Sequence, residues 1–311
     1  MKEELPMKKV LALVLVMLLV VASAAVAEGV IGFLPPAMTS PFYASCIEGA
    51  TPVAEALGYE LSVLAPPAED DYATQTSMME DFITQGVKGI AVCGINLEAL
   101  KPAIEKANAA GIPVVMFNTI TELEGVDVYA YSGYNQYNGG AKIADWVNTQ
   151  TNGEAKVAII EGLPSDYTTQ RMGGFVDRAK EAYPGIEVVA SQPGDWVRET
   201  GMNAAMDMIQ AHPEITVIYG LSDEMALGAY QACQQLGRSD IITVGLDGNP
   251  NALESVKAGE LTATLDCGPV AIGANAIKAL AEAIDGVERT EKVIEAETTV
   301  VDITLVDNFL K

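Results

Sequence analysis

Short apolar runs alternate with amphipathic stretches along almost the whole chain, and this alternation restricts the fold more than any other feature. The stretches between the runs have apolar residues three and four positions apart, which predicts helices. Apolar runs without polar alternation are typical of parallel strands that are buried on both faces. They cover residues 29–36, 59–67, 88–94, 112–119, 126–133, 155–162, 186–192, 215–222, 241–247 and 261–268.

Glycines mark the ends of the predicted helices in the first half of the chain. Gly58, Gly86 and Gly111 stand where a C-cap glycine is favoured. The same alternation then restarts in the second half without a low-complexity linker. We therefore expect an α/β protein of two doubly wound parallel-sheet lobes, joined by crossovers of the chain that act as a hinge.

The N-terminal segment has the order of a secretory signal peptide. Lys8 and Lys9 precede an apolar run, and the run ends at Ala25-Val26-Ala27. We expect residues 1–27 to be removed and the mature protein to be periplasmic or otherwise extracytoplasmic. A single transmembrane anchor is the alternative, although the apolar run is short for one. The true start is Met1 or Met7.

Composition restricts the partners. The chain of 311 residues has 18 Lys and Arg against 42 Asp and Glu, a formal charge of −24. Without residues 1–27, which carry three Lys and two Glu, the charge is about −25. Such a chain repels nucleic acid, because nucleic-acid binding requires cationic groups.

The cysteines and the histidine indicate neither a metal centre nor catalysis. Cys46, Cys93, Cys233 and Cys267 form no CxxC pair, so no metal site is expected. Four cysteines outside the cytoplasm allow three complete disulfide pairings, but small buried hydrophobic residues are the favoured interpretation. The only histidine, His212, is expected to cap a helix. No nucleophile elbow, phosphate-binding loop or cofactor motif is present, so we expect no enzyme and no cofactor.

Ligands of doubly wound proteins bind beyond the carboxyl ends of the strands. The segments at those ends are rich in Asn, Asp, Ser, Thr and aromatic residues, a set that suits a ring-shaped polyhydroxylated ligand. They are "PPAMTSPFY", "CGIN", "FNTI", "EGLPSDYTTQR", "SQPGDWVR", "GLSDE" and "LDGNPN".

The order of motifs resembles the periplasmic sugar-binding proteins of ABC importers, the ribose-binding group of type I periplasmic binding proteins. The motifs run along the mature chain as "SPFYASCIEGA", "ALGYEL", "QGVKGIAV", "AGIPVVMFN", "RMGGF", "ASQPGDW", "DEMALGA" and "VGLDGNP". The resemblance implies an N-terminal lobe of residues 28–132 and 267–298. It implies a C-terminal lobe of residues 133–266 and 299–311.

The resemblance also implies individual ligand-binding residues. Asp247 stands where the family's aspartate accepts hydrogen bonds from ligand hydroxyls, and Trp196 matches an aromatic residue that closes over the ring. Asp223 and Glu224 are assigned to the N-terminus of a helix, where acidic residues are favoured. The remaining matches are Ser40, Phe42, Tyr43 and Asn118 in the first lobe and Ser222 in the second.

Four matched positions depart from the ribose pattern. Thr119 and Thr169 stand where arginines are expected, while Arg171 matches an arginine interpreted as structural. Cys93 and Cys267 replace two further polar contacts. Threonine cannot reproduce the forked contacts of arginine, so ribose itself becomes doubtful as the ligand. A polyol, a deoxy sugar, a nucleoside or a cationic ligand is an alternative, the last because the threonines remove two arginine neighbours that Asp247 has in the ribose pattern.

The resemblance implies capture of a ligand by closure of the lobes and its delivery to a membrane permease. A monomer is expected. A ligand receptor for chemotaxis or signalling is the main alternative, with a chemoreceptor as partner. A transcription regulator with the same effector-binding fold would require a basic helix-turn-helix, where this chain has the predicted signal peptide.

Overall fold

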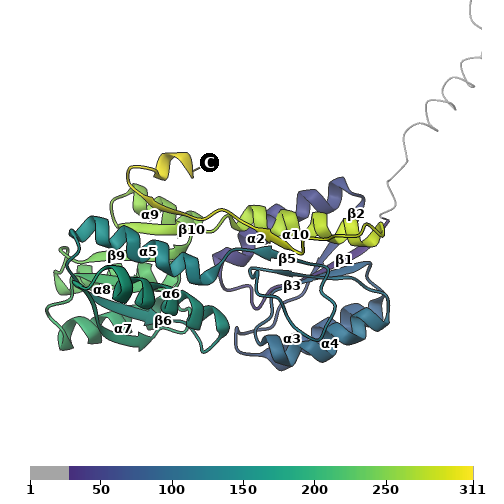
Figure 1. The fold of residues 1–311 in the computed structure, drawn as a ribbon, viewed down its shortest axis with the longest axis horizontal. Coiled ribbons are helices and arrows are strands. Elements are labelled where there is room, and N and C mark those ends of the chain that lie inside the picture. The colour runs from purple at the N-terminus through teal and green to yellow at the C-terminus, as the bar shows by residue number, and fades with distance from the viewer. Residues whose placement is uncertain (1–27, 311) are drawn as a thin grey trace, which may run out of the picture.

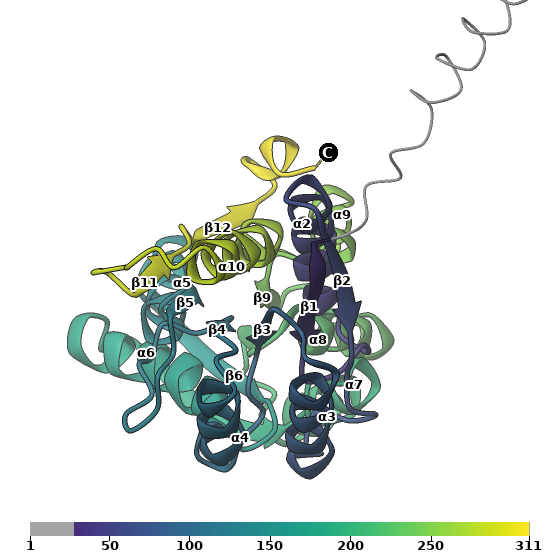
Figure 2. The same cartoon turned by 90° about the vertical axis from the view of Figure 1, so that its right-hand side faces the viewer.

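The computed structural model describes residues 28–310, which form two α/β lobes side by side (Figure 1). The predicted signal peptide lies outside the described residues. In the first lobe, helices α2 and α10 pack together on one face of a sheet, and helices α3 and α4 pack on the other, as the end view shows (Figure 2). The predicted fold class is confirmed.

The sheet of the first lobe is entirely parallel, in the order β11-β5-β4-β3-β1-β2. Every residue of β3, β4 and β5 is buried, because helices cover both faces of the sheet. The elements of this lobe are β1 (Gly29–Leu34), α2 (Pro41–Ala56), β2 (Tyr59–Val63), α3 (Tyr72–Gln85), β3 (Gly89–Val92), α4 (Leu97–Ala109), β4 (Val114–Phe117), β5 (Ala130–Gly133), α10 (Pro269–Ile284) and β11 (Val293–Glu295).

The sheet of the second lobe has the order β12-β10-β9-β8-β6-β7, and only β12 runs antiparallel to its neighbour. Helix α5 packs on α6, and α7 packs on α8. The elements are α5 (Gln136–Thr151), β6 (Ala155–Glu161), α6 (Asp166–Ala182), β7 (Ile186–Pro193), α7 (Arg198–Ala211), β8 (Val217–Gly220), α8 (Asp223–Leu236), β9 (Ile242–Asp247), α9 (Pro250–Lys257), β10 (Ala263–Asp266), β12 (Thr299–Asp302) and a short 3₁₀ turn, η1 (Val306–Asn308).

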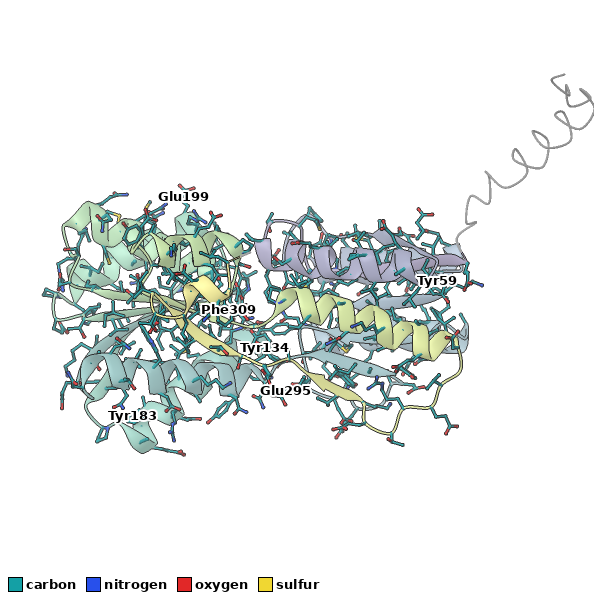
Figure 3. The ribbon with its side chains drawn as sticks, turned by 90° about the horizontal axis from the view of Figure 1, so that it is seen from above. Tyr59, Tyr134, Tyr183, Glu199, Glu295 and Phe309 are labelled. Atoms are coloured by element: carbon teal, nitrogen blue, oxygen red, sulfur yellow. The ribbon has the colours of Figure 1, made fainter. Side chains whose placement is uncertain are left out.

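The chain passes between the lobes three times. It leaves β5 for α5, β10 for α10 and β11 for β12, and each passage takes only a few residues. Side-chain bonds fasten this region, since Ser132 Oγ donates to the carbonyl of Ile272 at 2.9 Å and Lys142 Nζ donates to that of Thr298 at 2.7 Å. Tyr134 and Glu295 lie at the junction of the lobes (Figure 3).

Local features follow the sequence closely. Gly58, Gly86 and Gly111 adopt the left-handed backbone expected after a helix, with φ of 82°, 70° and 73°. His212 caps the end of α7, as predicted. All four cysteines are buried and free, which confirms their interpretation as small hydrophobic residues. Within residues 28–310, no helix combines the length and the apolar character needed to cross a membrane.

Candidate functional site

A cavity of about 330 Å³ lies between the lobes, at the carboxyl ends of the strands. Its volume is at the lower end of the range for small-molecule sites, about 300–1,000 Å³. Both lobes contribute to its wall. The lining residues are Pro36, Ser40, Phe42, Tyr43, Glu69, Asp70, Tyr72, Gly94, Ile95, Asn96 and Asn118 of the first lobe, and Leu163, Pro164, Ser165, Tyr167, Arg171, Trp196, Ser222, Glu224 and Asp247 of the second.

Asp247 is the last residue of β9 and lies in a strained turn. Its φ is 142°, and the next residue, Gly248, has φ of 78°. A Cβ on Gly248 would meet the Cα of Asp266 on the neighbouring strand at 2.6 Å, so only glycine fits there. Asp223 braces the turn from behind, since its carboxylate accepts from the backbone N–H of Asn249 at 2.8 Å and from Thr264 Oγ1 at 2.5 Å. The turn therefore holds the Asp247 carboxylate at the cavity wall.

Backbone strain recurs at the cavity. Asn118 and Trp196 also have positive φ, at 62° and 65°. Residues other than glycine rarely adopt this conformation, and where they do, the surrounding structure stabilises it at functional sites. Three of the described non-glycine residues with positive φ thus line the same cavity.

Arg171 of α6 forms a buried ion pair with Asp247. Its Nη1 lies 3.3 Å from Asp247 Oδ1 and donates to the carbonyl of Leu221 at 2.7 Å. Burial raises the pKa of the Asp247 carboxyl to about 6, and the Arg171 guanidinium opposes that rise. Burial alone would lower the pKa of Arg171, but Tyr134 and Asp247 outweigh it, so the guanidinium stays charged. The cavity wall thus offers a guanidinium donor, whose Nη2 donates to no other described residue, beside a carboxylate acceptor.

Gln136 links this pair to the other lobe. Its Oε1 accepts from Arg171 Nε at 2.8 Å, and its Nε2 donates to the carbonyl of Asn118 at 2.8 Å. Gln136 is only 2% exposed, and it begins α5 directly after the first passage of the chain between the lobes. A continuous buried chain of polar groups therefore connects Asn118 of the first lobe to Asp247 of the second.

Aromatic rings line both sides of the cavity. Phe42 and Tyr43, in the first turn of α2, are buried and pack edge to face with centroids 5.5 Å apart. Trp196 comes from the loop after β7, and the Arg171 guanidinium lies 5.3 Å from the centre of its ring. A Cβ on Gly162 would lie 2.0 Å from this indole, so the absence of a side chain there makes room for the ring.

The lobes contact one another beside the cavity. Cys93 Sγ and the Tyr167 hydroxyl are 3.4 Å apart, and Gln170 Nε2 donates to Thr121 Oγ1 at 3.4 Å. Burial raises the pKa of the Tyr43 and Tyr167 phenols well above the ordinary value, so both remain neutral hydrogen-bonding groups. The structure shows the lobes meeting across the cleft.

Most of the sequence-predicted site residues meet at this cavity. Four do not line it. Thr169 is exposed on α6 and donates to the backbone of Ser165 at 3.0 Å. Thr119 is buried and accepts from the N–H of Thr121 at 3.1 Å. Cys93 and Cys267 are fully buried behind the wall. The predicted residues that line the cavity are Ser40, Phe42, Tyr43, Asn118, Trp196, Ser222 and Asp247.

The role assigned to Arg171 requires a correction. The sequence interpretation treated it as structural and gave the ligand-facing position to Thr169. The structure places Arg171 in the cavity wall and Thr169 in solvent, because residues two apart on a helix face nearly opposite directions. The argument for a cationic ligand also loses its basis, since Asp247 keeps an arginine neighbour.

Sequence reasoning missed one whole segment of the cavity. Glu69, Asp70 and Tyr72 lie in the loop after β2 and at the start of α3. Ligand sites gather at the carboxyl ends of strands, and this rule applies to β2 as well. It could therefore have predicted that the loop after β2 lines the cavity. Glu224 lies in a predicted segment but was assigned only to helix capping; in the structure it pairs with Arg198 at 2.8 Å and lines the cavity.

The chemistry of the wall suits binding by hydrogen bonds. Among residues 28–310, no three His, Cys, Asp or Glu side chains gather closely enough to hold a metal ion. The described polar groups of the cavity are four carboxyl groups, one of them paired with a guanidinium, together with amides, hydroxyls and phenols, and aromatic rings lie beside them. Rings cover the C–H faces of a small polyhydroxylated molecule, and the polar groups bind its hydroxyls.

Raised carboxyl pKa values predict that the free protein loses stability as the pH rises. Burial raises the pKa of Glu69 to about 7 and the pKa values of Asp247 and Asp266 to about 6, and it raises the pKa of Asp223 well above its ordinary value. In the folded state these groups keep protons that the unfolded chain has released, so their stabilising contribution is present at low pH and is lost up to about pH 7. The free energy of unfolding should fall by about 1–3 kcal/mol between pH 5.5 and pH 8.

Thermal unfolding at constant ionic strength measures this dependence. In Glu69→Gln the fall should be smaller than in the wild type, whereas Asp70→Asn, at the exposed neighbouring position, should behave as the wild type. Stability that is constant or that increases over this range would contradict the assignment of buried, protonatable carboxyls.

Two lobes with a ligand-sized cavity between them define the class of two-lobed solute-binding proteins. A family model described as a periplasmic binding protein domain matches residues 31–288, and the chain belongs to this family. The ribose import binding protein of Bacillus subtilis is 33% identical over 270 residues, covering 86% of each chain. The D-allose-binding periplasmic protein of Escherichia coli is 31% identical over 281 residues, covering 88% of each.

A solved structure is similar over almost the whole fold. A periplasmic solute-binding protein of an ABC transporter from Actinobacillus succinogenes, with bound D-allose, superposes with a TM-score of 0.86 at 30% identity. The match covers 90% of this chain and 100% of that one. The predicted resemblance to the sugar-binding proteins of ABC importers is confirmed.

Proposed function

We propose that this protein captures a small sugar or related polyol between its lobes outside the cytoplasm and delivers it to the permease of an ABC importer, without chemical conversion. The Asp247–Arg171 pair carries the proposal. It presents a carboxylate acceptor and a guanidinium donor at the wall of a cavity that both lobes line. Neighbouring hydroxyls of a sugar ring match this pairing, because each hydroxyl both donates and accepts.

The size of the cavity favours a monosaccharide over a nucleoside. A volume of about 330 Å³ is close to the minimum for small-molecule sites. The relatives also favour a monosaccharide, since the names of two of them specify ribose and D-allose. The departures at Thr119, Cys93 and Cys267 from the ribose pattern leave D-ribose as one candidate among stereoisomers and polyols.

Hinge closure supplies the signal to the permease. We place the hinge at the three passages between the lobes, at residues 133–136, 266–269 and 295–299, with residues 1–27 removed as a signal peptide. Ligand stabilises the closed arrangement because only there do both walls contact it. A monomer suffices for this cycle. The same closure would also serve a receptor for chemotaxis or signalling.

A thermal-shift screen of the mature protein tests the proposal. The panel contains D-ribose, D-allose, other pentoses and hexoses, xylitol, myo-inositol and nucleosides. We expect at least one sugar or polyol to raise the melting temperature, because a ligand that binds only the folded state stabilises it. Stabilisation by nucleosides alone, or by no compound of the panel, would contradict the proposed ligand class.

Tryptophan fluorescence should report the closure through Trp196. Trp196 lines the cavity, whereas Trp146 belongs to α5 and its Nε1 donates to Asp302 Oδ2 at 3.3 Å. The sugar that binds should change the emission of the wild type and of Trp146→Phe. Trp196→Ala should abolish the change and weaken binding by about 1–3 kcal/mol, the range for a buried aromatic contact. A response that survives in Trp196→Ala and disappears in Trp146→Phe would exclude Trp196 as the residue that covers the ligand.

A further inference from the structure

Glu69 differs from Glu224 and Asp247, the other acids of the cavity wall that are not exposed, because no described residue pairs with it. Glu224 is held by Arg198 at 2.8 Å and by Asn251 at 2.7 Å, and Asp247 is held by Arg171. Glu69 lines the cavity and is half-buried, but it forms no hydrogen bond and no ion pair with the rest of residues 28–310. A carboxylate taken out of water requires donors, and here the cavity is the side from which they can come.

The charges of the wall point to the kind of donor. Four acidic residues line the cavity, namely Glu69, Asp70, Glu224 and Asp247, against Arg171 as the one cationic side chain among the lining residues. Even with Arg171 and Arg198 neutralising their partners, the side of the cavity formed by the β2–α3 loop stays negative. An anionic ligand would meet repulsion there, whereas hydroxyl and amine donors would be attracted.

We propose that Glu69 determines specificity: its carboxylate accepts hydrogen bonds from hydroxyl or amine groups on the ligand edge that faces the β2–α3 loop. The site then takes uncharged or amine-bearing polyols and rejects sugar acids and sugar phosphates. This inference rests on the proposed function, since it names a further contact and a charge preference of the same site.

Protonation gives the contact a measurable signature. Burial raises the pKa of Glu69 to about 7, the charge of Asp247 adds to the rise, and Arg171 opposes it. Donors from a ligand stabilise the ionised form, so binding should lower this pKa and release a proton near neutral pH. The other titratable groups at the cavity are Asp247, Glu224 and Asp70, while the Tyr43 and Tyr167 phenols and the Cys93 thiol have raised pKa values and stay neutral.

Calorimetry with the sugar or polyol that stabilises the protein most in the panel tests the inference. The titration is repeated in two buffers of different ionisation enthalpy at pH 7, and affinity is measured from pH 6 to pH 8. The wild type should release about half a proton at pH 7, and its affinity should rise about tenfold or more over the range, because ionisation of Glu69 must precede its contact. Glu69→Gln should release few protons on binding. Its affinity should change by only about twofold from pH 6 to pH 8, which is the part of the pH dependence that belongs to Asp247.

Glu60→Gln is the matched control, because it makes the same substitution at an exposed residue of β2 that does not line the cavity. It should retain the proton release and the pH dependence of the wild type. The phosphate monoester of the same sugar should not bind the wild type. Proton release that persists in Glu69→Gln, or a phosphate ester that binds as tightly as its parent sugar, would overturn the inference while leaving the proposed function intact. If no sugar or polyol of the panel binds, the proposed function fails and the inference fails with it.

Discussion

Replacing Asp247 with alanine is expected to weaken binding of the sugar by about 2–4 kcal/mol, because buried ligand hydroxyls would lose a charged acceptor. Asp247 is 5% exposed, and its carboxylate lies at the cavity wall in a strained turn that Gly248 and Asp223 hold in place. Asp247→Asn should recover only part of the affinity, since an amide oxygen accepts a weaker hydrogen bond than a carboxylate. Calorimetric titration measures both variants.

Asp207 provides a control for Asp247. It is an exposed residue of α7 and does not line the cavity. Asp207→Ala makes the same substitution and should bind the sugar as the wild type does. If Asp247→Ala retains near wild-type affinity, Asp247 is a turn residue only, and the ligand is bound by other groups.

Replacing Arg171 with methionine is expected to have the largest effect on the folded protein, a loss of about 3–5 kcal/mol in the free energy of unfolding. The change leaves Asp247 as a buried charge without its partner and removes the donors to Leu221 and Gln136. Binding of the sugar should also be lost, because the guanidinium donor of the cavity wall is absent. Denaturant unfolding and calorimetry measure the two effects.

Two further variants separate the loss of a charge from the loss of a ligand contact. Arg178→Met removes an arginine from the same helix whose partner, Asp145, is 44% exposed, so its effect on stability should be below about 1 kcal/mol. The double variant Arg171→Met/Asp247→Leu removes both buried charges and should recover much of the stability, but not the binding. A double variant as unstable as Arg171→Met would show that the packing of Arg171, rather than the unpaired charge, causes the loss.

The elements that the sequence predicted best are those with the longest uninterrupted apolar patterns. Every residue of β3 and β4 is buried, so no polar side chain interrupts "GIAV" or "VVMF", and both segments are recognisable as buried strands. β11 and β12 were not predicted as strands. They lie at the edges of their sheets and are partly exposed, so "VIE" and "TVVD" show no continuous apolar run.

The site was predictable where a residue ends a strand and less so where it lies on a helix or in a loop. Asp247 and Asn118 follow directly from the topology, because the carboxyl ends of parallel strands meet at one edge of the sheet. The position of Arg171 does not follow from the topology. Residues two apart on α6 face nearly opposite directions, so an error of two residues in the alignment moves the prediction from the cavity side of the helix to the exposed side. Glu69 lies in the loop after β2, where nothing in "APPAEDDY" distinguishes it from its exposed neighbour Asp70.

Calorimetric titration of the wild-type protein, with Asp247→Ala beside it, tests the central claim most directly. The titrant is the sugar or polyol that raises the melting temperature most. The cavity between the lobes predicts one ligand per chain and a Kd of about 1 μM or tighter, close to −8 kcal/mol, with a marked loss in Asp247→Ala. Absence of binding heat with every sugar and polyol of the panel, or binding that Asp247→Ala leaves unchanged, would contradict a sugar-capturing site between the two lobes.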